Sequence, residues 1–219
     1  MNKEKAFIFD LDGVIVDTAK YHYKAWKKLA NDLGFDFTEE QNELLKGVSR
    51  ARSLEILLNI GSMTLPDDEK VRVMQSKNEH YLSYIKQMEQ DEILEGMQQV
   101  LLHLKENNIP FSLGSASKNA RLILEQLELI ELFDAIVDGN DVSKAKPDPE
   151  VFLIASNKLG VAPENCVVVE DAIAGIEAAN LAGMISIGIG DTKTLKEASL
   201  VFPSTKGLTI DVINKLISN

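Results

Sequence analysis

The chain has 219 residues, of which 45% are hydrophobic and 26% are charged, and its formal net charge at pH 7 is −11. This length predicts one large domain, or a core with a small insertion, that buries on the order of 70% of the surface exposed by the unfolded chain. The acidic excess argues against a protein that binds nucleic acid along its phosphates, although local positive charge can still attract a small anion into a cleft.

Short apolar runs alternate with helical patterns through most of the chain. The runs, which we interpret as buried strands, are 6–9, 110–113, 135–137, 166–169, 185–189 and 200–202. Helices are predicted over 96–107, 119–127, 149–159 and 173–182, and Gly160 and Gly183 fall where two of them should end. Strands that alternate with helices indicate an α/β fold, a Rossmann-like parallel sheet with helices on both faces.

The alternation lapses between residues 17 and 91. Apolar residues such as Trp26, Leu33 and Leu54 recur there at helical spacing, and no strand pattern is present. We therefore expect a helical insertion between the first and second strands. Residues 61–69, which include Gly61 and Pro66, are expected to form a loop within it.

The first apolar run ends in acidic residues, since Asp10 follows Phe9 directly and Asp12 comes two positions later. A carboxylate at the end of a buried strand is costly unless it has a metal, a partner or a chemical role. If the chain stays extended past Asp10, both side chains face one cleft, and Gly13 then permits a tight turn. The alternative is an ordinary turn at a strand end, where Asp is common.

Other polar residues follow later strands. Ser115 and the pair Glu170–Asp171 lie at the ends of predicted strands, and Lys146 lies in the loop after the third strand. Open parallel sheets bind ligands at the carboxyl ends of their strands. Four separate segments are therefore expected to converge on one edge of the sheet.

Several of these stretches resemble a known family. Asp10-Leu11-Asp12-Gly13-Val14 resembles the first motif of the haloacid dehalogenase-like hydrolases, a family of phosphoryl-transfer enzymes. Within that family, the β-phosphoglucomutases are similar to this chain at Lys46-Gly47-Val48-Ser49-Arg50, Ser115-Ala116-Ser117-Lys118-Asn119 and Glu170-Asp171. The similarity extends over most of the chain. It implies a core domain of residues 1–16 and 92–219 and a helical cap domain of residues 17–91, hinged near Asp17 and Asp91.

A carboxylate can attack phosphorus to form an aspartyl phosphate, and a second carboxylate can move the proton of a sugar hydroxyl. The resemblance gives the first role to Asp10 and the second to Asp12. It also implies a Mg²⁺ ion between Asp10, the backbone carbonyl of Asp12, Glu170 and Asp171, with Asp171 the stronger candidate for direct ligation. The alternative for Glu170–Asp171 is a helix N-terminus, where acidic residues are also favoured.

The segment 115–119 joins a strand to a helix, where hydroxyls and free amides suit a phosphate. Ser117 or Asn119 can instead cap that helix. Pro147 and Pro149 stiffen the loop around Lys146; Lys144 is the rival cation, and the Lys-Pro match to the family favours Lys146. The candidate phosphate-binding residues are Ser115, Ala116, Ser117, Lys118, Asn119 and Lys146.

The cap is expected to supply substrate specificity. Lys46 and Arg50 flank Gly47 before a helix and can bind the phosphate that is not transferred, Arg50 through two N–H groups. The alternative there is an ordinary helix start capped by Ser49. In the β-phosphoglucomutases that the chain resembles, a histidine at the position of His22 contacts the substrate. We expect one face of Trp26 to pack in the core of the cap and the other to line the substrate site. Lys77 is a further candidate, at the rim of the cap. The candidate cap residues are Thr18, His22, Trp26, Lys46, Gly47, Val48, Ser49, Arg50 and Lys77.

The resemblance implies an isomerase that interconverts β-D-glucose 1-phosphate and β-D-glucose 6-phosphate, with Mg²⁺ as cofactor and glucose 1,6-bisphosphate as intermediate and activator. The alternative is a sugar-phosphate phosphatase on the same scaffold, which differs in letting water attack the aspartyl phosphate. A binding protein without turnover is a third interpretation, which the presence of Asp10 and the acidic pair disfavours. We expect a monomer whose partner is a small phosphorylated sugar, with no nucleic acid and no membrane.

The N-terminus and the cysteine content predict the compartment. The first apolar run begins at Ala6, which leaves no room for a signal peptide, and no run approaches the ~20 residues of a membrane span. The single cysteine, Cys166, lies in an apolar run, cannot form an internal disulfide and is expected to be a buried thiol. The sequence therefore predicts a soluble cytoplasmic protein.

Overall fold

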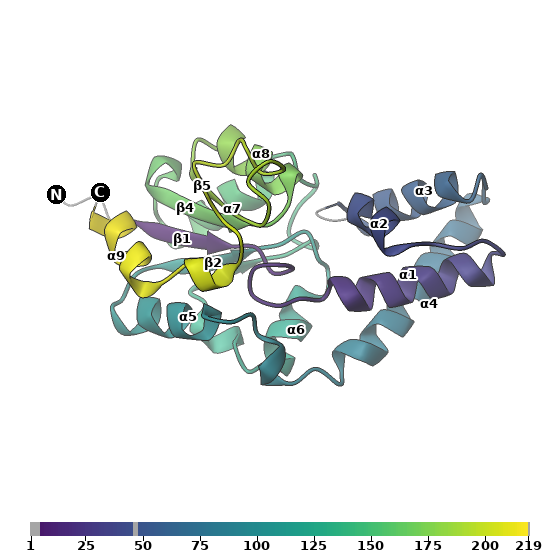
Figure 1. The fold of residues 1–219 in the computed structure, drawn as a ribbon, viewed down its shortest axis with the longest axis horizontal. Coiled ribbons are helices and arrows are strands. Elements are labelled where there is room, and N and C mark those ends of the chain that lie inside the picture. Colours follow the sequence, from purple (N-terminus) through teal and green to yellow (C-terminus); the bar gives the residue numbers. More distant parts are fainter. Residues whose placement is uncertain (1–4, 46–47, 219) are drawn as a thin grey trace. The chain divides into compact units, whose positions relative to one another are not determined.

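The computed structural model describes residues 5–45 and 48–218. Contacts between Cα atoms divide the chain into two compact units. The core unit comprises Met1–Asp17 and Glu89–Asn219, and the cap unit comprises Thr18–Met88 (Figure 1).

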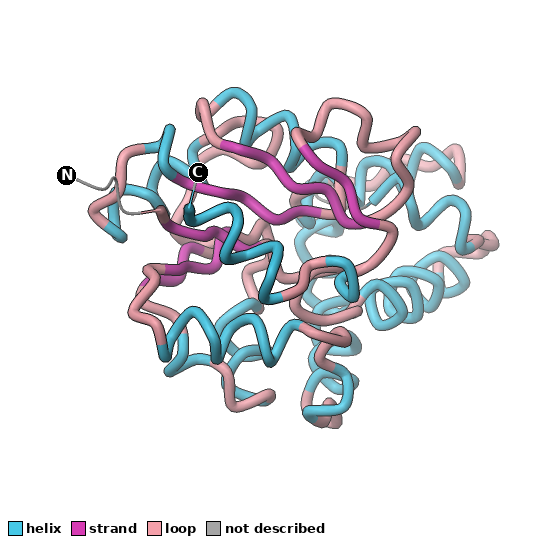
Figure 2. The backbone as a smooth tube through the Cα atoms, turned by 60° about the vertical axis from the view of Figure 1, so that its left-hand side comes forward, coloured by secondary structure: helices cyan, strands magenta, loops and turns pink. Residues whose placement is uncertain are grey.

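The core unit contains a six-stranded sheet with the order β3-β2-β1-β4-β5-β6, in which all neighbours are parallel. Its strands are β1 (Ala6–Phe9), β2 (Phe111–Gly114), β3 (Ala135–Val137), β4 (Cys166–Glu170), β5 (Ile185–Ile189) and β6 (Leu200–Phe202). Figure 2 shows these strands side by side, with helices outside them. The predicted α/β fold and its strands are confirmed. The second strand begins at Phe111 rather than Pro110, which has no N–H for the ladder.

Side chains that alternate along the central strands bury two faces of the sheet. Ile8 of β1 and Val168 of β4 share a buried cluster with Phe152 and Ala178, which follow β3 and β4 in the chain. On the opposite side, the ring of Phe9 lies 6.3 Å, centroid to centroid, from that of Phe111. The central strands β1, β2 and β4 are therefore fully buried, and their charged residues lie at or just beyond the strand ends.

The four helices predicted for the core unit are present with bounds within one residue of the prediction, and a further helix over 210–218 was not predicted. They are α5 (Met97–Glu106), α6 (Ala120–Gln126), α7 (Glu150–Leu159), α8 (Ile173–Leu181) and α9 (Ile210–Ser218), with short 3₁₀ turns η2 (Gln90–Glu92), η3 (Ile130–Leu132), η4 (Pro163–Asn165) and η5 (Thr205–Gly207). Gly160 ends α7 in the left-handed conformation, with φ 70°, as its position in the sequence predicts.

Cys166 is a buried free thiol, and burial raises its pKa to about 11.

The described part of the cap unit is helical and contains no strand. Its elements are α1 (Ala19–Asp32), α2 (Glu39–Asn42), η1 (Glu43–Leu45), α3 (Arg50–Ile60) and α4 (Asp67–Ile85), and its buried cluster includes Trp26, Phe37 and Leu57. The loop predicted over 61–69 is shorter than expected, because α4 already begins at Asp67. Pro66 precedes a first turn of Asp67, Asp68 and Glu69, and acidic residues stabilise a helix N-terminus. Among the described residues, no helix has the length and hydropathy of a membrane span.

Candidate active site

The register of the central strands aligns three segments at one edge of the sheet. Phe9 of β1 lies opposite Leu113 of β2 and Val169 of β4, so the residues that follow them, Asp10, Gly114 and Glu170, stand at the same level. The backbone N–H of Asp10 donates to Val169 O at 2.9 Å, which continues the ladder to the carboxylate. The register of the strands therefore brings the segments that follow β1, β2 and β4 to the same edge of the sheet.

Beyond Asp10 the chain does not stay extended. The backbone N–H groups of Ile15 and Val16 both donate to Leu11 O, at 2.9 and 3.1 Å, and Gly13 adopts a positive φ of 76°. Asp12 lies within this turn and is partly exposed. Asp12 therefore belongs to the turn that follows Asp10, and its role in proton transfer stays a prediction.

Lys146 is the cation at Asp10. Its Nζ lies 2.5 Å from Asp10 Oδ1 and 2.5 Å from Glu170 Oε1, and it donates to Gly114 O at 3.0 Å. Its side chain is 1% exposed. Lys144, the rival, is 69% exposed and pairs with Asp148 at 3.3 Å. Of the two lysines, only Lys146 is placed to act on a group bound at Asp10.

The ionisation of these groups follows from their burial and their neighbours. Burial raises the pKa of Asp10 to about 6; Lys146 opposes this shift and Glu170 adds to it. Burial alone lowers the pKa of Lys146, but the carboxylates of Asp10 and Glu170 outweigh it and hold that pKa above its ordinary value. At pH 7.5 Asp10 is therefore ionised and Lys146 is protonated.

Three carboxylates form a group that fits a divalent cation. One oxygen from each of Asp10, Glu170 and Asp171 lies within 4.8 Å of the others. A Cβ at Gly13 would overlap the carboxylate of Asp171, so glycine makes room for that side chain. Mg²⁺ prefers such oxygen ligands and keeps several waters. The residues present therefore suit the ion that the family resemblance implies.

Both carboxylate oxygens of Glu170 are bonded within the protein. Its Oε1 contacts Lys146, and its Oε2 accepts the N–H groups of Asp171 and Ala172, both at 2.9 Å. The acidic pair also lies before Ala172, the N-cap of α8, and so outside the first turn of that helix. Protein contacts therefore hold both oxygens of Glu170, and Asp171 as the stronger candidate for direct ligation stays a prediction.

Asp171→Asn is accordingly expected to weaken Mg²⁺ binding by about 10- to 100-fold, and more than Glu170→Gln does. Titration calorimetry of the metal-free protein with Mg²⁺ measures this directly. Asp191→Asn is the matched control, because Asp191 follows β5 at the same edge and bonds only locally, to Thr194 at 2.9 Å. Equal Mg²⁺ affinities for the Asp171 variant and the control would exclude a metal site at the acidic pair.

The candidate phosphate segment 115–119 is folded by its own hydroxyls. Ser115 is buried, and its Oγ accepts the N–H of Ser117 at 3.1 Å; the Oγ of Ser117 accepts the N–H of Asn119 at 3.2 Å. Asn119 is the N-cap residue of α6 but makes no side-chain cap bond, and Ser117 lies before the cap position. Neither residue therefore caps α6, and consecutive serine turns shape the segment instead.

In the cap unit, Lys77 is buried among other cap residues. Its residue is 3% exposed, and its Nζ lies 3.0 Å from His22 Nδ1, 4.4 Å from the centroid of the Trp26 ring and 4.9 Å from that of Tyr81. Aromatic faces and a neutral imidazole stabilise a buried ammonium by cation–π attraction and hydrogen bonding. The structure brings Lys77, His22 and Trp26 together in one cluster.

The remaining cap candidates lie at helix starts. Ser49 Oγ accepts the N–H of Arg52 at 3.3 Å and so caps α3, after the partly exposed Val48. Arg50, the first residue of α3, donates from Nη2 to Asn78 Oδ1 at 2.7 Å. Thr18 is buried before α1. Lys46 and Gly47 lie outside the described residues, so their predicted phosphate contact stays a prediction.

His22 makes the stability of the protein sensitive to acid. Burial, with the charges of Lys77 and Arg50, holds the pKa of His22 well below 6.5. Below about pH 6.5 the unfolded chain therefore binds a proton that the folded chain does not, and stability falls with a slope of up to about 1.4 kcal/mol per pH unit. His22→Gln should reduce the loss of unfolding free energy between pH 7.5 and 5.5, measured by urea denaturation. An unchanged loss would contradict this origin.

Sequence reasoning missed some residues that shape the site. A Cβ at Gly175, in the first turn of α8, would overlap the carboxylate of Glu170. The sequence did offer a signal for Gly175, because a glycine inside a predicted helix usually has a packing or functional reason. Phe152 of α7, whose ring centroid lies 4.8 Å from Lys146 Nζ, had no signal beyond its place in an apolar stripe.

Comparison with known proteins fits this arrangement of a parallel sheet, a buried carboxylate, a lysine and an acidic pair. Residues 4–183 match the family model described as haloacid dehalogenase-like hydrolase. The chain belongs to this family, as its motifs predicted.

Individual proteins similar to this chain point to a more specific group within the family. A β-phosphoglucomutase from Bacillus subtilis is 42% identical over 96% of this chain and 94% of its own length. The crystal structure of β-phosphoglucomutase from Clostridium difficile superposes with a TM-score of 0.93 at 45% identity, covering 98% of this chain and 97% of the other. A phosphorylated carbohydrates phosphatase from Thermotoga maritima is 31% identical, over 90% and 92%.

Proposed function

We propose that this protein is a Mg²⁺-dependent β-phosphoglucomutase that interconverts β-D-glucose 1-phosphate and β-D-glucose 6-phosphate. The observation that carries the proposal is the buried contact of Asp10 with Lys146 and Glu170, in a chain 42% to 45% identical to two β-phosphoglucomutases over nearly its whole length. The relative named as a phosphatase of phosphorylated carbohydrates is more distant, at 31%.

In the proposed reaction, the Asp10 carboxylate forms and releases the bond to phosphorus. When phosphorylated Asp10 donates to glucose 1-phosphate, Asp12 takes the proton from the 6-hydroxyl as that oxygen attacks. The resulting glucose 1,6-bisphosphate then presents its other phosphate to Asp10. The P–O bond at C1 breaks, Asp12 protonates the leaving oxygen, and glucose 6-phosphate is released with Asp10 again phosphorylated.

Lys146 and the segment 115–119 act on the transferring group. The ammonium of Lys146 is already held beside Asp10 Oδ1, so it offsets the negative charge that develops on the phosphoryl oxygens without first having to move. Asp10, Glu170, Asp171 and the Asp12 carbonyl would hold Mg²⁺, which reduces the repulsion between the carboxylates and the phosphate. The Ser115 hydroxyl and the amides of the segment supply further donors.

In this proposal, the cap binds the phosphate group that is not being transferred. A mutase must hold a bisphosphate while its ends exchange, and this requires a second anion site. Arg50 uses one N–H group on Asn78, and a guanidinium has five in all, so it can still bind phosphate oxygens bidentately. Lys46 is proposed to add a second positive charge. Binding energy from this end of the substrate supports the chemical step at the other.

The test that separates the mutase from the phosphatase alternative is the ratio of products. The wild type is expected to convert β-glucose 1-phosphate, with glucose 1,6-bisphosphate present, to glucose 6-phosphate in large excess over inorganic phosphate. Arg50→Ala and Lys46→Ala should lower isomerisation much more than hydrolysis of the aspartyl phosphate. Arg52→Ala is the matched control, since Arg52 lies on the same helix and pairs with Glu55 at 2.8 Å. Phosphate as the main product, with a ratio unchanged in the variants, would establish the phosphatase.

Glucose 1,6-bisphosphate is part of this proposal as intermediate and as the source of the first phosphate on Asp10. The substrate is a small phosphorylated sugar, in line with what the names of the relatives imply. The cytoplasmic location and the monomeric state stay predictions of the sequence.

A further inference from the structure

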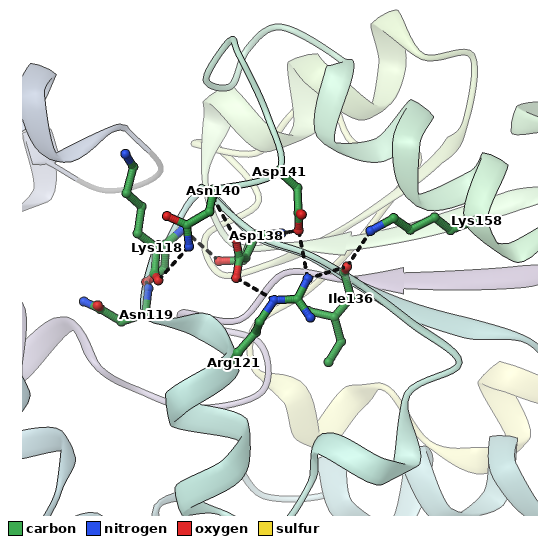
Figure 3. A network of polar contacts seen from close by, with 10 residues as sticks. Lys118, Asn119, Arg121, Ile136, Asp138, Asn140, Asp141 and Lys158 are labelled. Atoms are coloured by element: carbon green, nitrogen blue, oxygen red, sulfur yellow. Dashed lines mark hydrogen bonds and ion pairs between the residues drawn. The ribbon is translucent and has the colours of Figure 1, made fainter.

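The loop after β3 packs its backbone against the candidate phosphate segment. The N–H of Gly139 donates to Ser117 O at 3.2 Å, and the side-chain amide of Asn140 donates to Lys118 O at 3.1 Å (Figure 3). Two adjacent peptide groups of the segment thus have their carbonyls bonded to this loop, which comprises residues 138–141.

Glycine is required at position 139 for this approach. A Cβ there would overlap Ala116 O and would lie 3.1 Å from the carbonyl carbon of Ala116 and 3.0 Å from Lys118 Cγ. These distances are shorter than ordinary van der Waals contacts, and two of the atoms belong to backbone that cannot rotate away. The backbones of the two loops are therefore in close contact at Gly139.

A network of charged groups fixes the conformation of loop 138–141. Asp138 is 1% exposed; its Oδ1 accepts the N–H of Asn140 at 2.8 Å, and its Oδ2 lies 3.0 Å from Arg121 Nε. Arg121 Nη2 reaches Asp141 Oδ2 at 2.9 Å, and the same oxygen accepts the N–H of Asp138 at 3.0 Å. The contact between Asp138 Oδ2 and Arg121 is an ion pair rather than a hydrogen bond, and a buried carboxylate is costly unless it is paired in this way.

Arg121 closes the network into a ring. It is the second residue of α6, directly after the phosphate segment, and it binds Asp138 and Asp141 while Gly139 and Asn140 bind back to Ser117 and Lys118. Figure 3 shows Arg121 facing Asp138 and Asp141, with Asn140 reaching toward Lys118. Loop 138–141 is thus bonded to Ser117 and Lys118 and, through Arg121, to the first turn of α6.

The geometry of the peptide bond connects this ring to phosphate binding. In a trans peptide the N–H points away from the C=O of the preceding residue. When Gly139 fixes Ser117 O, it also fixes the N–H of Lys118, which is directed away from loop 138–141. A hydrogen-bond donor for a phosphoryl oxygen must be held in its position in advance to contribute to catalysis.

We propose that Arg121, Asp138 and Asn140 are positioning residues that orient the backbone amides of the segment 115–119 for phosphate. The proposal rests on the proposed function only in that this segment binds a phosphate of the substrate. They act through the segment rather than by touching substrate.

The test uses variants of the full chain that weaken the ring, one at the exposed Asn140 and one at the partly exposed Arg121. Asn140→Ala removes the bond to Lys118 O, and Arg121→Met removes the ties to Asp138 and Asp141. Lys158→Ala is the matched control, because Lys158 donates to Ile136 O at 3.1 Å beside Arg121, which donates to the same oxygen at 3.1 Å. Asn140 and Lys158 are both exposed, so neither change should prevent folding.

Asn140→Ala and Arg121→Met are expected to weaken binding of inorganic phosphate, in the presence of Mg²⁺, by about 10-fold in titration calorimetry. The affinity for Mg²⁺ alone should stay at the wild-type value, since the acidic group at β1 and β4 is separate from the ring. Lys158→Ala should change neither affinity. A merely structural role would lower both affinities together or leave both intact.

Gly139→Ala gives a second measurement that does not depend on charge. The added Cβ must displace the backbone at Ala116, so it should weaken phosphate binding at least as much as Asn140→Ala does. Wild-type phosphate affinity in Asn140→Ala, Arg121→Met and Gly139→Ala would overturn the proposal. Because phosphate binding is measured without turnover, a wild type that releases phosphate instead of glucose 6-phosphate would defeat the mutase proposal alone.

Discussion

Asp10→Asn is expected to abolish turnover and all incorporation of phosphate into the protein. An amide oxygen is a poor nucleophile for phosphorus, so no covalent intermediate can form. The measurement is incubation with labelled glucose 1,6-bisphosphate, acid quenching and detection of label on the protein. Acid-stable label on the variant, or full activity, would overturn the aspartyl phosphate mechanism.

The fold should survive this change. Lys146 keeps its contact with Glu170, and burial already disfavours the charged form of Asp10, whose pKa is raised to about 6. Circular dichroism and the unfolding temperature of Asp10→Asn are therefore expected to be close to those of the wild type. Asp191→Asn serves again as the control, because it removes a carboxylate at the same sheet edge that is outside the proposed site.

Lys146→Ala is expected to lower kcat by about 10²–10³, the usual cost of losing one preorganised group that stabilises developing charge. The ammonium contacts both Asp10 and Glu170 at 2.5 Å, so its loss leaves two buried carboxylates facing each other. Breaking a buried ion pair typically costs about 3–5 kcal/mol, so urea unfolding should show a lower stability as well. Kinetics are measured at a temperature where the variant remains folded.

The control for Lys146→Ala is Lys144→Ala. Lys144 lies in the same proline-framed loop but is exposed and pairs with Asp148, so its removal should leave kcat unchanged. A reduction in kcat of less than about threefold for Lys146→Ala would show that another cation stabilises the transferring group.

The sequence predicted the parts of the site that depend on strands. Apolar runs defined β1, β2 and β4, and the rule that parallel strands present ligands at their carboxyl ends brought Asp10, Ser115 and Glu170 together. The family match at Lys-Pro selected Lys146 over Lys144, and the structure places Lys146 at Asp10. These inferences were reliable because a buried strand leaves a strong local signal and its end has a defined direction.

Contacts between distant segments were not predictable in the same way. The burial of Lys77 had no signal in the sequence, because Trp26, Tyr81 and the imidazole of His22 surround it only when α1 and α4 pack. Gly139 likewise gives no signal in sequence, since its role depends on the backbone of Ala116 lying against it. Such contacts depend on tertiary packing and not on local pattern.

The acidic group at Asp10 has a thermodynamic consequence. When Asp10 is ionised, the group of three carboxylates (Asp10, Glu170 and Asp171) and the ammonium of Lys146 together carry a formal net charge of −2 before any ligand binds. A phosphate dianion is repelled by such a centre, and a divalent cation neutralises it. Each ligand should therefore raise the affinity of the other by the same factor, as binding linkage requires. Free Mg²⁺ in the cell would then set how much sugar phosphate the protein holds, independently of how fast it reacts.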